Sequence, residues 1–153
     1  MPPGCDVEWH GHRLTLLPER AAWWPAQRAL VVADLHLGKP ASFRSMGVPA
    51  PEAVTGGDLS RLTRALQRTG AERLLVLGDL LHASSGMSGA TIDGVSAWRE
   101  GHRSLDVLIV RGNHDRRAGD PPREWAFACV DGPHALDGLD LATHIKNQGA
   151  LRI

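Results

Sequence analysis

The sequence lacks a net charge, a long apolar run and any closely spaced pair of cysteines. Lysine plus arginine (17) equals aspartate plus glutamate (17), so any affinity for phosphate must be local. The sequence contains no run of about 18 apolar residues, which is the length needed to span a bilayer, and the amino terminus has no apolar signal segment. Cys5 and Cys129 lie far apart, which argues against a disulfide framework and a thiolate zinc site. A soluble protein of the reducing cytoplasm is expected.

Three short apolar runs organise the chain, and each is followed by polar residues. They are rich in valine, leucine and isoleucine and show no alternation of polar and apolar residues, which is typical of strands buried on both faces. The runs are Ala29–Ala33, Leu74–Leu77 and Val107–Val110. Weaker signals predict a short edge strand at Leu14–Leu17, just before Pro18, and further strands within 125–130 and 139–142.

Helical patterns separate the three runs. Leucines recur at helical spacing over Asp58–Arg68, with Asp58 as the expected N-cap and Gly70 as the expected stop. A weaker helix is expected at 91–102. Strand, helix, strand, helix, strand is the order of an α/β layered fold with a parallel sheet, and 153 residues are enough for a single domain, 1–153.

Residues of the kinds that bind metals follow all three runs. The first run leads into Asp34-Leu35-His36, the second into Gly78-Asp79, and the third into Gly112-Asn113-His114-Asp115. Because ligands bind outside the carboxyl ends of strands in parallel sheets, these side chains are expected to converge. Each motif alone has an ordinary interpretation as turn chemistry or a surface pair. Their occurrence together, in this order and each at a strand end, favours a functional site.

These motifs resemble those of the calcineurin-like metallophosphoesterases. The segments ADLHLGKPASFRSMGVPAPE and LVLGDLLHA are similar to the bacterial ligase-associated DNA damage response endonuclease subfamily (PdeM), over about Leu30–Asp115. The resemblance implies a layered sandwich in which helices flank two β-sheets, family-like from about 12 to 143, with a divergent tail at 145–153. It also implies a phosphodiesterase or endonuclease that acts on nucleic acid in DNA repair by two-metal activation of a water.

The resemblance also assigns roles to individual residues. Asp34 and His36 would bind the first metal, Asp79 would bridge two metals, and Asn113 would bind the second. His114 would act on the scissile phosphate or the leaving oxygen, with Asp115 orienting its imidazole. Oxygen and nitrogen ligands without thiolates favour manganese, iron or zinc over calcium, and the family favours manganese.

The carboxyl-terminal part departs from the family pattern. The family continues with a strand-end histidine and a Gly-His-x-His motif, and this sequence contains no Gly-His-x-His. His144 is the candidate for the strand-end histidine and a further metal ligand. The chain is expected to be truncated, frameshifted near Thr143 or a divergent paralogue, in that order. An apolar sheet face left uncovered would then favour dimers or aggregates.

The sequence is compatible with several functions. The chain is either an active metallophosphoesterase or a weak or inactive protein of the same fold. A phosphomonoesterase or nucleotide pyrophosphatase would use the same metal core. The substrate is expected to be a phosphate ester, with DNA as the candidate polymer, and the resemblance suggests repair ligases or helicases as partners. Four other histidines are interpreted as surface residues: His10, His12, His102 and His134.

Overall fold

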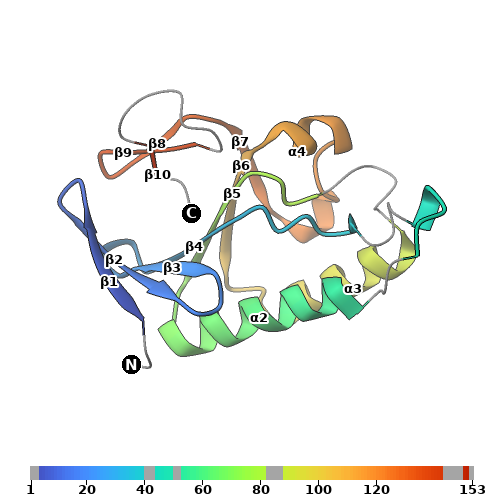
Figure 1. The fold of residues 1–153 in the computed structure, drawn as a ribbon, viewed down its shortest axis with the longest axis horizontal. Helices are drawn as coiled ribbons and strands as arrows, with labels where there is room; N and C mark the ends of the chain where they lie inside the picture. Colours follow the sequence, from blue (N-terminus) through green and yellow to red (C-terminus); the bar gives the residue numbers. More distant parts are fainter. Residues whose placement is uncertain (1–3, 40–43, 50–52, 82–87, 143–149, 152–153) are drawn as a thin grey trace.

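A computed structural model describes residues 4–39, 44–49, 53–81, 88–142 and 150–151. The strands are β1 Cys5–Trp9, β2 His12–Leu17, β3 Ala21–Trp24, β4 Ala29–Ala33, β5 Arg73–Leu77, β6 Asp106–Arg111, β7 Ala128–Asp131, β8 His134–Leu136, β9 Leu139–Leu141 and β10 Ala150–Leu151. The helices are α2 Ala53–Thr69, α3 Gly89–Glu100 and α4 Asn113–Ala118, with 3-10 turns η1 Pro25–Gln27 and η3 Arg123–Trp125. Figure 1 shows three layers: α2 and α3, the main sheet, and a small sheet.

The main sheet has seven strands in the order β1 to β7. Strands β1 to β4 form an antiparallel meander, whereas β4, β5, β6 and β7 pair in parallel. The parallel half contains the three apolar runs, in register: Ala33 lies opposite Leu77, and Leu77 opposite Val110. The predicted α/β layered fold is confirmed, and the polar residues after each run reach the same edge.

The apolar runs lack polar residues because the sheet is covered on both faces. Leu30 and Val32 of β4 belong to the core beneath α2 and α3, whereas Ala29 and Val31 belong to a second core on the opposite face. Strand β5 alternates in the same way and is almost fully buried throughout. At roughly 1.5–3 kcal/mol for each fully buried aliphatic side chain, these two cores dominate the fold's stability.

The small sheet covers the second face. Strands β8, β9 and β10 are hydrogen-bonded in the order β10-β9-β8, and Leu139 and Leu141 of β9 are fully buried against Val31 and Val110. The expectation of an uncovered sheet face is therefore wrong for the described part of the chain. The strands expected within 125–130 and 139–142 correspond to β7 and β9, while Trp125 itself lies in η3.

Helix α2 begins five residues before the predicted start. Asp58 is not its N-cap: it lies inside the helix and forms an ion pair with Arg61, at 2.9 Å. The helical end was predicted correctly, because Gly70 has a left-handed φ of 64° and its N–H donates to the Leu66 carbonyl at 2.8 Å. Helix α3 is N-capped by Ser88, whose hydroxyl accepts from the Thr91 N–H.

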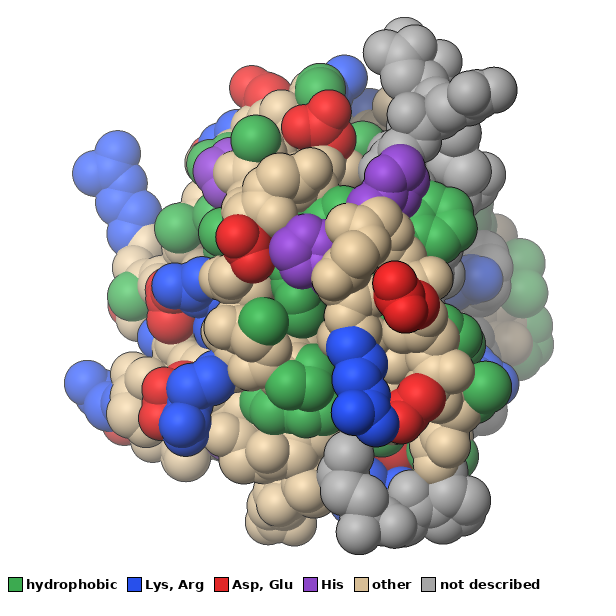
Figure 2. Space-filling model, turned by 90° about the vertical axis from the view of Figure 1, so that its left-hand side faces the viewer, with side chains coloured by type: hydrophobic (Ala, Val, Ile, Leu, Met, Phe, Trp, Pro, Cys, Tyr) green, Lys and Arg blue, Asp and Glu red, His purple; other side chains and the backbone are tan. Residues whose placement is uncertain are grey.

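The amino-terminal strands were only partly predicted. Strand β2 is not an edge strand, since it pairs with β1 on one side and β3 on the other. The edge strand is β1, whose sequence CDVEW is almost entirely exposed and carries little hydrophobic signal. Figure 2 shows this end of the molecule, where acidic and basic side chains are interspersed with apolar ones. Among the described residues, no helix is long and apolar enough to cross a membrane.

Candidate metal centre

Three donor side chains meet at the carboxyl edge of the parallel strands. Asp34 and His36 follow β4, Asp79 follows β5, and one ligand atom of each lies within 4.8 Å of the others. His36 and Asp79 are partly buried, whereas Asp34 is exposed, so the group is open to solvent on one side. The structure thus brings together three of the residues predicted to bind metal.

Backbone hydrogen bonds continue beyond the strands and fix these loops to one another. The Asp34 N–H donates to the Gly78 carbonyl at 3.2 Å, and the His36 N–H donates to the Asp79 carbonyl at 2.7 Å. The Gly78 N–H donates in turn to the Val110 carbonyl of β6, at 2.8 Å. The donor-bearing loops are therefore extensions of the sheet, which holds metal ligands more precisely than a free loop does.

All three donor residues have left-handed backbone conformations. Their φ angles are 51° for Asp34, 48° for His36 and 51° for Asp79. A non-glycine residue in this region costs on the order of 1–3 kcal/mol and persists only where the surrounding structure enforces it. Such strain gathers at functional sites, and its occurrence at all three donors supports a functional assignment.

Gly112 brings the third motif against Asp79. A Cβ atom at Gly112 would lie 2.4 Å from Asp79 Oδ1 and 2.9 Å from the Asp79 backbone nitrogen. The φ of Gly112 is −95°, so glycine is needed here for space rather than for backbone conformation. Asn113 comes next, exposed, as the first residue of α4. Gly112 thus places the start of the third motif next to the carboxylate of Asp79.

Asp115 connects the loop that follows β5 to the loop that follows β6. Its side chain is 5% exposed; Oδ1 accepts from the Leu81 N–H at 3.1 Å and Oδ2 from the Gly112 N–H at 2.9 Å. Sequence reasoning missed this contact, although an acidic residue three positions after Gly112 is the spacing of a helix N-terminal cap. The predicted contact between Asp115 and the His114 imidazole stays a prediction, because the His114 side chain lies outside the described part of the structure.

We expect Asp115→Asn to destabilise the fold and loosen the metal centre. The amide keeps one acceptor oxygen but turns an N–H₂ group toward a backbone N–H, and a buried unsatisfied donor costs about 1–3 kcal/mol. Denaturant unfolding should show this loss. The matched control is Asp106→Asn, which breaks an exposed pair with Arg73 at 3.0 Å and should cost less than about 1 kcal/mol. Equal losses in the two variants would contradict the assigned role.

The donor set suits a divalent ion. Two carboxylates and one imidazole without thiolate match manganese, iron or zinc, and the 4.8 Å limit on the spacing of the donor atoms allows them to share one cation. Donors of this kind, held on strained backbone at one sheet edge, fit the metal site that the sequence predicts. The chemistry of the residues and their placement therefore agree.

The sequence profile described as calcineurin-like phosphoesterase matches residues 27–148 of this chain. The chain belongs to the calcineurin-like phosphoesterase family. In structure it is similar to the crystal structure of Pseudomonas putida nuclease MPE, with 42% sequence identity and a TM-score of 0.80. The similarity covers 92% of this chain and 66% of the nuclease chain, so this chain spans slightly less than two thirds of the nuclease's length. No curated protein matches the sequence.

An ion-paired arginine that the sequence reasoning missed lies at the end of β6, one residue before Gly112. Arg111 ends β6 and donates from Nε and Nη2 to the two carboxylate oxygens of Asp120, at 2.7 and 2.9 Å. These hydrogen bonds raise the pKa of the Arg111 guanidinium above its ordinary value and lower the pKa of Asp120. Asp131 lies 3.6 Å from Arg111 Nη1. The positive charge of Arg111 is therefore largely compensated locally.

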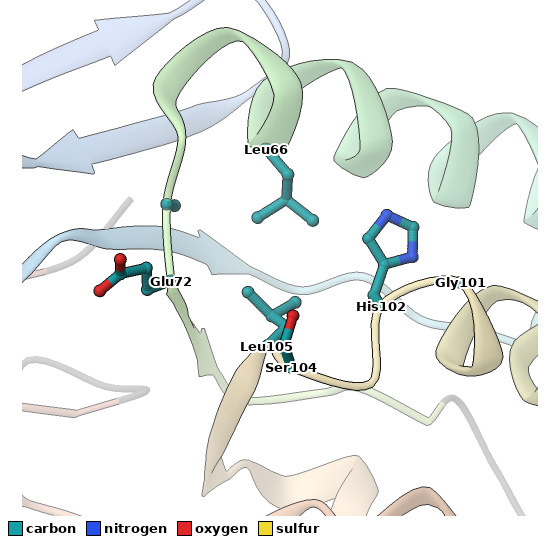
Figure 3. A pocket seen from close by; sticks show the side chains of 7 residues that line it. Leu66, Glu72, Gly101, His102, Ser104 and Leu105 are labelled. Carbon is teal, nitrogen blue, oxygen red and sulfur yellow. The ribbon is translucent and has the colours of Figure 1, made fainter.

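The remaining histidines are not part of the described donor group. His144, the further predicted ligand, lies outside the described residues. His102 Nδ1 is 2.7 Å from the Trp98 carbonyl oxygen, and its ring stacks on the Trp98 indole. His102 also lines an open hollow of about 450 Å³ with Leu66, Glu72 and Leu105 (Figure 3). This hollow lies where β5 and β6 begin, at the edge of the sheet opposite the metal donors.

Proposed function

We propose that this chain is a metal-dependent phosphodiesterase that cleaves the backbone of nucleic acid, as an endonuclease in DNA repair. The observation that carries the proposal is the group of Asp34, His36 and Asp79 at one sheet edge, with Gly112 packed against Asp79 and Asn113 next in the chain. The family assignment supports hydrolysis of phosphate esters. The 42% identity to a nuclease supports nucleic acid as the substrate, and the sequence resemblance supports the repair role.

We assign the protein's side chains as follows. Asp34 and His36 would hold a first divalent ion, Asn113 and His144 would hold a second, and Asp79 would serve both. When bound, the two ions supply Lewis-acid chemistry at the phosphoryl group, and manganese is the favoured identity. The negative charge of the Asp79 carboxylate would offset the repulsion between two such cations.

His114 is assigned to the substrate rather than to a metal. A histidine beside the scissile phosphate donates a proton to the leaving oxygen or stabilises negative charge on the phosphoryl group. The backbone of His114 lies in the first turn of α4, two residues after Gly112. Its position in the chain therefore brings it close to the loop that packs against Asp79.

The cellular setting is also a proposal. Cys5 and Cys129 are free thiols, which suits a reducing cytoplasm. Repair ligases or helicases are the partners that the sequence resemblance suggests. A second candidate function is a metal-binding protein of this fold with weak or no turnover, which would use the same group of Asp34, His36 and Asp79.

A substrate panel with manganese distinguishes these candidates. The panel contains single- and double-stranded oligonucleotides, bis(p-nitrophenyl) phosphate, p-nitrophenyl phosphate and a dinucleoside pyrophosphate. We expect internal cleavage of the oligonucleotides and hydrolysis of the diester, both lost on chelation of the metal. Turnover of the monoester or pyrophosphate alone would replace the proposal by one of the related activities. Bound manganese without any turnover would favour the binding protein.

A further inference from the structure

Helix α4 carries two consecutive exposed arginines next to the metal centre. The helix begins at Asn113, immediately after the glycine that packs against Asp79, and contains Arg116 and Arg117 in its last turn. In Figure 1, α4 lies beyond the ends of β5 and β6 at which the donor loops emerge. Because the whole chain has no net charge, any attraction for a polyanion must come from a local group of this kind.

The nearby carboxylates leave one of the arginines uncompensated. Arg111 is bound by Asp120 through two hydrogen bonds, and Asp131 lies 3.6 Å from its guanidinium. The same Asp131 Oδ1 is 3.9 Å from Arg116 Nε. Arg117 has no ion pair with any residue in the described ranges. Its charge is therefore available to a ligand.

Arg117 lies about one helical turn from the residues proposed to act in catalysis. Arg117 lies three residues after His114 and four after Asn113 in the chain, so it follows both by about one helical turn. At 1.5 Å of rise per residue, the separation along the axis is about 4.5–6 Å. Side chains on a helix lean toward its amino terminus, so a side chain as long as that of Arg117 can reach the preceding turn, which begins at Asn113.

We propose that Arg117 binds a backbone phosphate one or two nucleotides from the scissile one, and so favours polynucleotides over small phosphate esters. This rests on the proposed function, in which His114 acts at the scissile phosphate and Asn113 holds a metal ion. Successive phosphates of one strand are about 3.4 Å apart along a duplex axis, so one turn of helix spans roughly one to two steps of the strand. Arginine suits the contact because its planar guanidinium binds phosphate oxygens in pairs.

The test compares two substrates in Arg117→Gln. Bis(p-nitrophenyl) phosphate has one phosphate, whereas an oligonucleotide offers neighbours on both sides of the scissile bond. The ratio of kcat/KM for the oligonucleotide to that for the small diester should fall about 10-fold, mainly through KM, as expected for a lost charge-assisted contact. The matched control is Arg64→Gln, which removes an exposed arginine from α2 and should keep the ratio.

Binding measured without turnover separates this inference from the proposed function. We expect Arg117→Gln to weaken the binding of a labelled phosphorothioate oligonucleotide about 10-fold, measured by fluorescence anisotropy, and to reduce the slope of log K against log salt by about 0.7–1. An unchanged slope and affinity would overturn the role of Arg117, whether or not the chain is a nuclease. A changed slope in a chain without turnover would retain the phosphate contact and reject the nuclease.

Discussion

Asp79→Ala is expected to reduce the affinity for divalent metal more than any other single substitution in the chain. In the described donor group, Asp79 is the only residue from the second strand end, and it is assigned to both ions. Its removal leaves Asp34 and His36 as a two-ligand site and removes the charge that offsets two neighbouring cations. Changes near metal ligands already cost about 10–100-fold in affinity, so we expect more than roughly 100-fold for the shared ligand.

Calorimetric titration with manganese, together with metal analysis after reconstitution, measures this effect. Asp106→Ala is the control, because it removes an exposed carboxylate at the opposite end of β6. The unfolding transition should be recorded for both variants. The Asp79 side chain is only partly buried, and the hydrogen bonds to its backbone do not depend on the side chain. Manganese affinity that survives Asp79→Ala would reject the shared-ligand assignment, and a wild-type chain that binds no metal would reject the centre itself.

The strand ends could be predicted because burial on both faces leaves a plain signal in the sequence. Leu74–Leu77 has no polar residue, since alternate side chains enter two different cores. A carboxylate that follows such a run must lie at the edge of the sheet. Parallel pairing then brings Asp34 and Asp79 together without any knowledge of the loops. This is why the convergence of these side chains could be predicted from the sequence alone.

Other features depend on tertiary contacts that the sequence does not show. The first residues of α2 include Gly56 and Gly57, which have low helix propensity and resemble a loop, yet the helix extends over them. The packing of Leu59, Leu62 and Leu66 against the sheet stabilises the helix as a whole. In the same way, nothing in the sequence shows that the buried carboxylate of Asp115 accepts hydrogen bonds from two separate loops.

The left-handed backbone conformations of Asp34, His36 and Asp79 are visible only in the structure and not in the sequence. Non-glycine residues are uncommon in left-handed backbone, although aspartate and histidine adopt it more often than most, and here all three donors do so. The hydrogen bond between the His36 N–H and the Asp79 carbonyl, at 2.7 Å, is formed with both residues in that conformation. The two donor loops therefore stabilise each other's geometry. A change in one loop should be felt at the ligand of the other.

His114→Ala is expected to remove most of the hydrolytic rate while leaving metal content nearly unchanged. General acid catalysis by a positioned histidine contributes about 10²–10⁴-fold, so kcat for bis(p-nitrophenyl) phosphate should fall by about that factor. The metal should remain, because the proposal assigns Asp34, His36 and Asp79 to the metals and His114 to the phosphate. Both quantities are measured on the same protein preparation, by steady-state kinetics with manganese and by metal analysis.

The control for this variant is His102→Ala, which removes a histidine that stacks on Trp98 at the opposite edge of the sheet. It should leave both the rate and the metal content close to those of the wild-type chain. Parallel loss of rate and metal in His114→Ala would make His114 a ligand instead of a proton donor. A rate unaffected by His114→Ala would remove this histidine from the chemistry altogether. A fall in kcat with metal retained is the outcome that requires His114 at the phosphate, because only a group that acts after the metals are bound separates the two measurements.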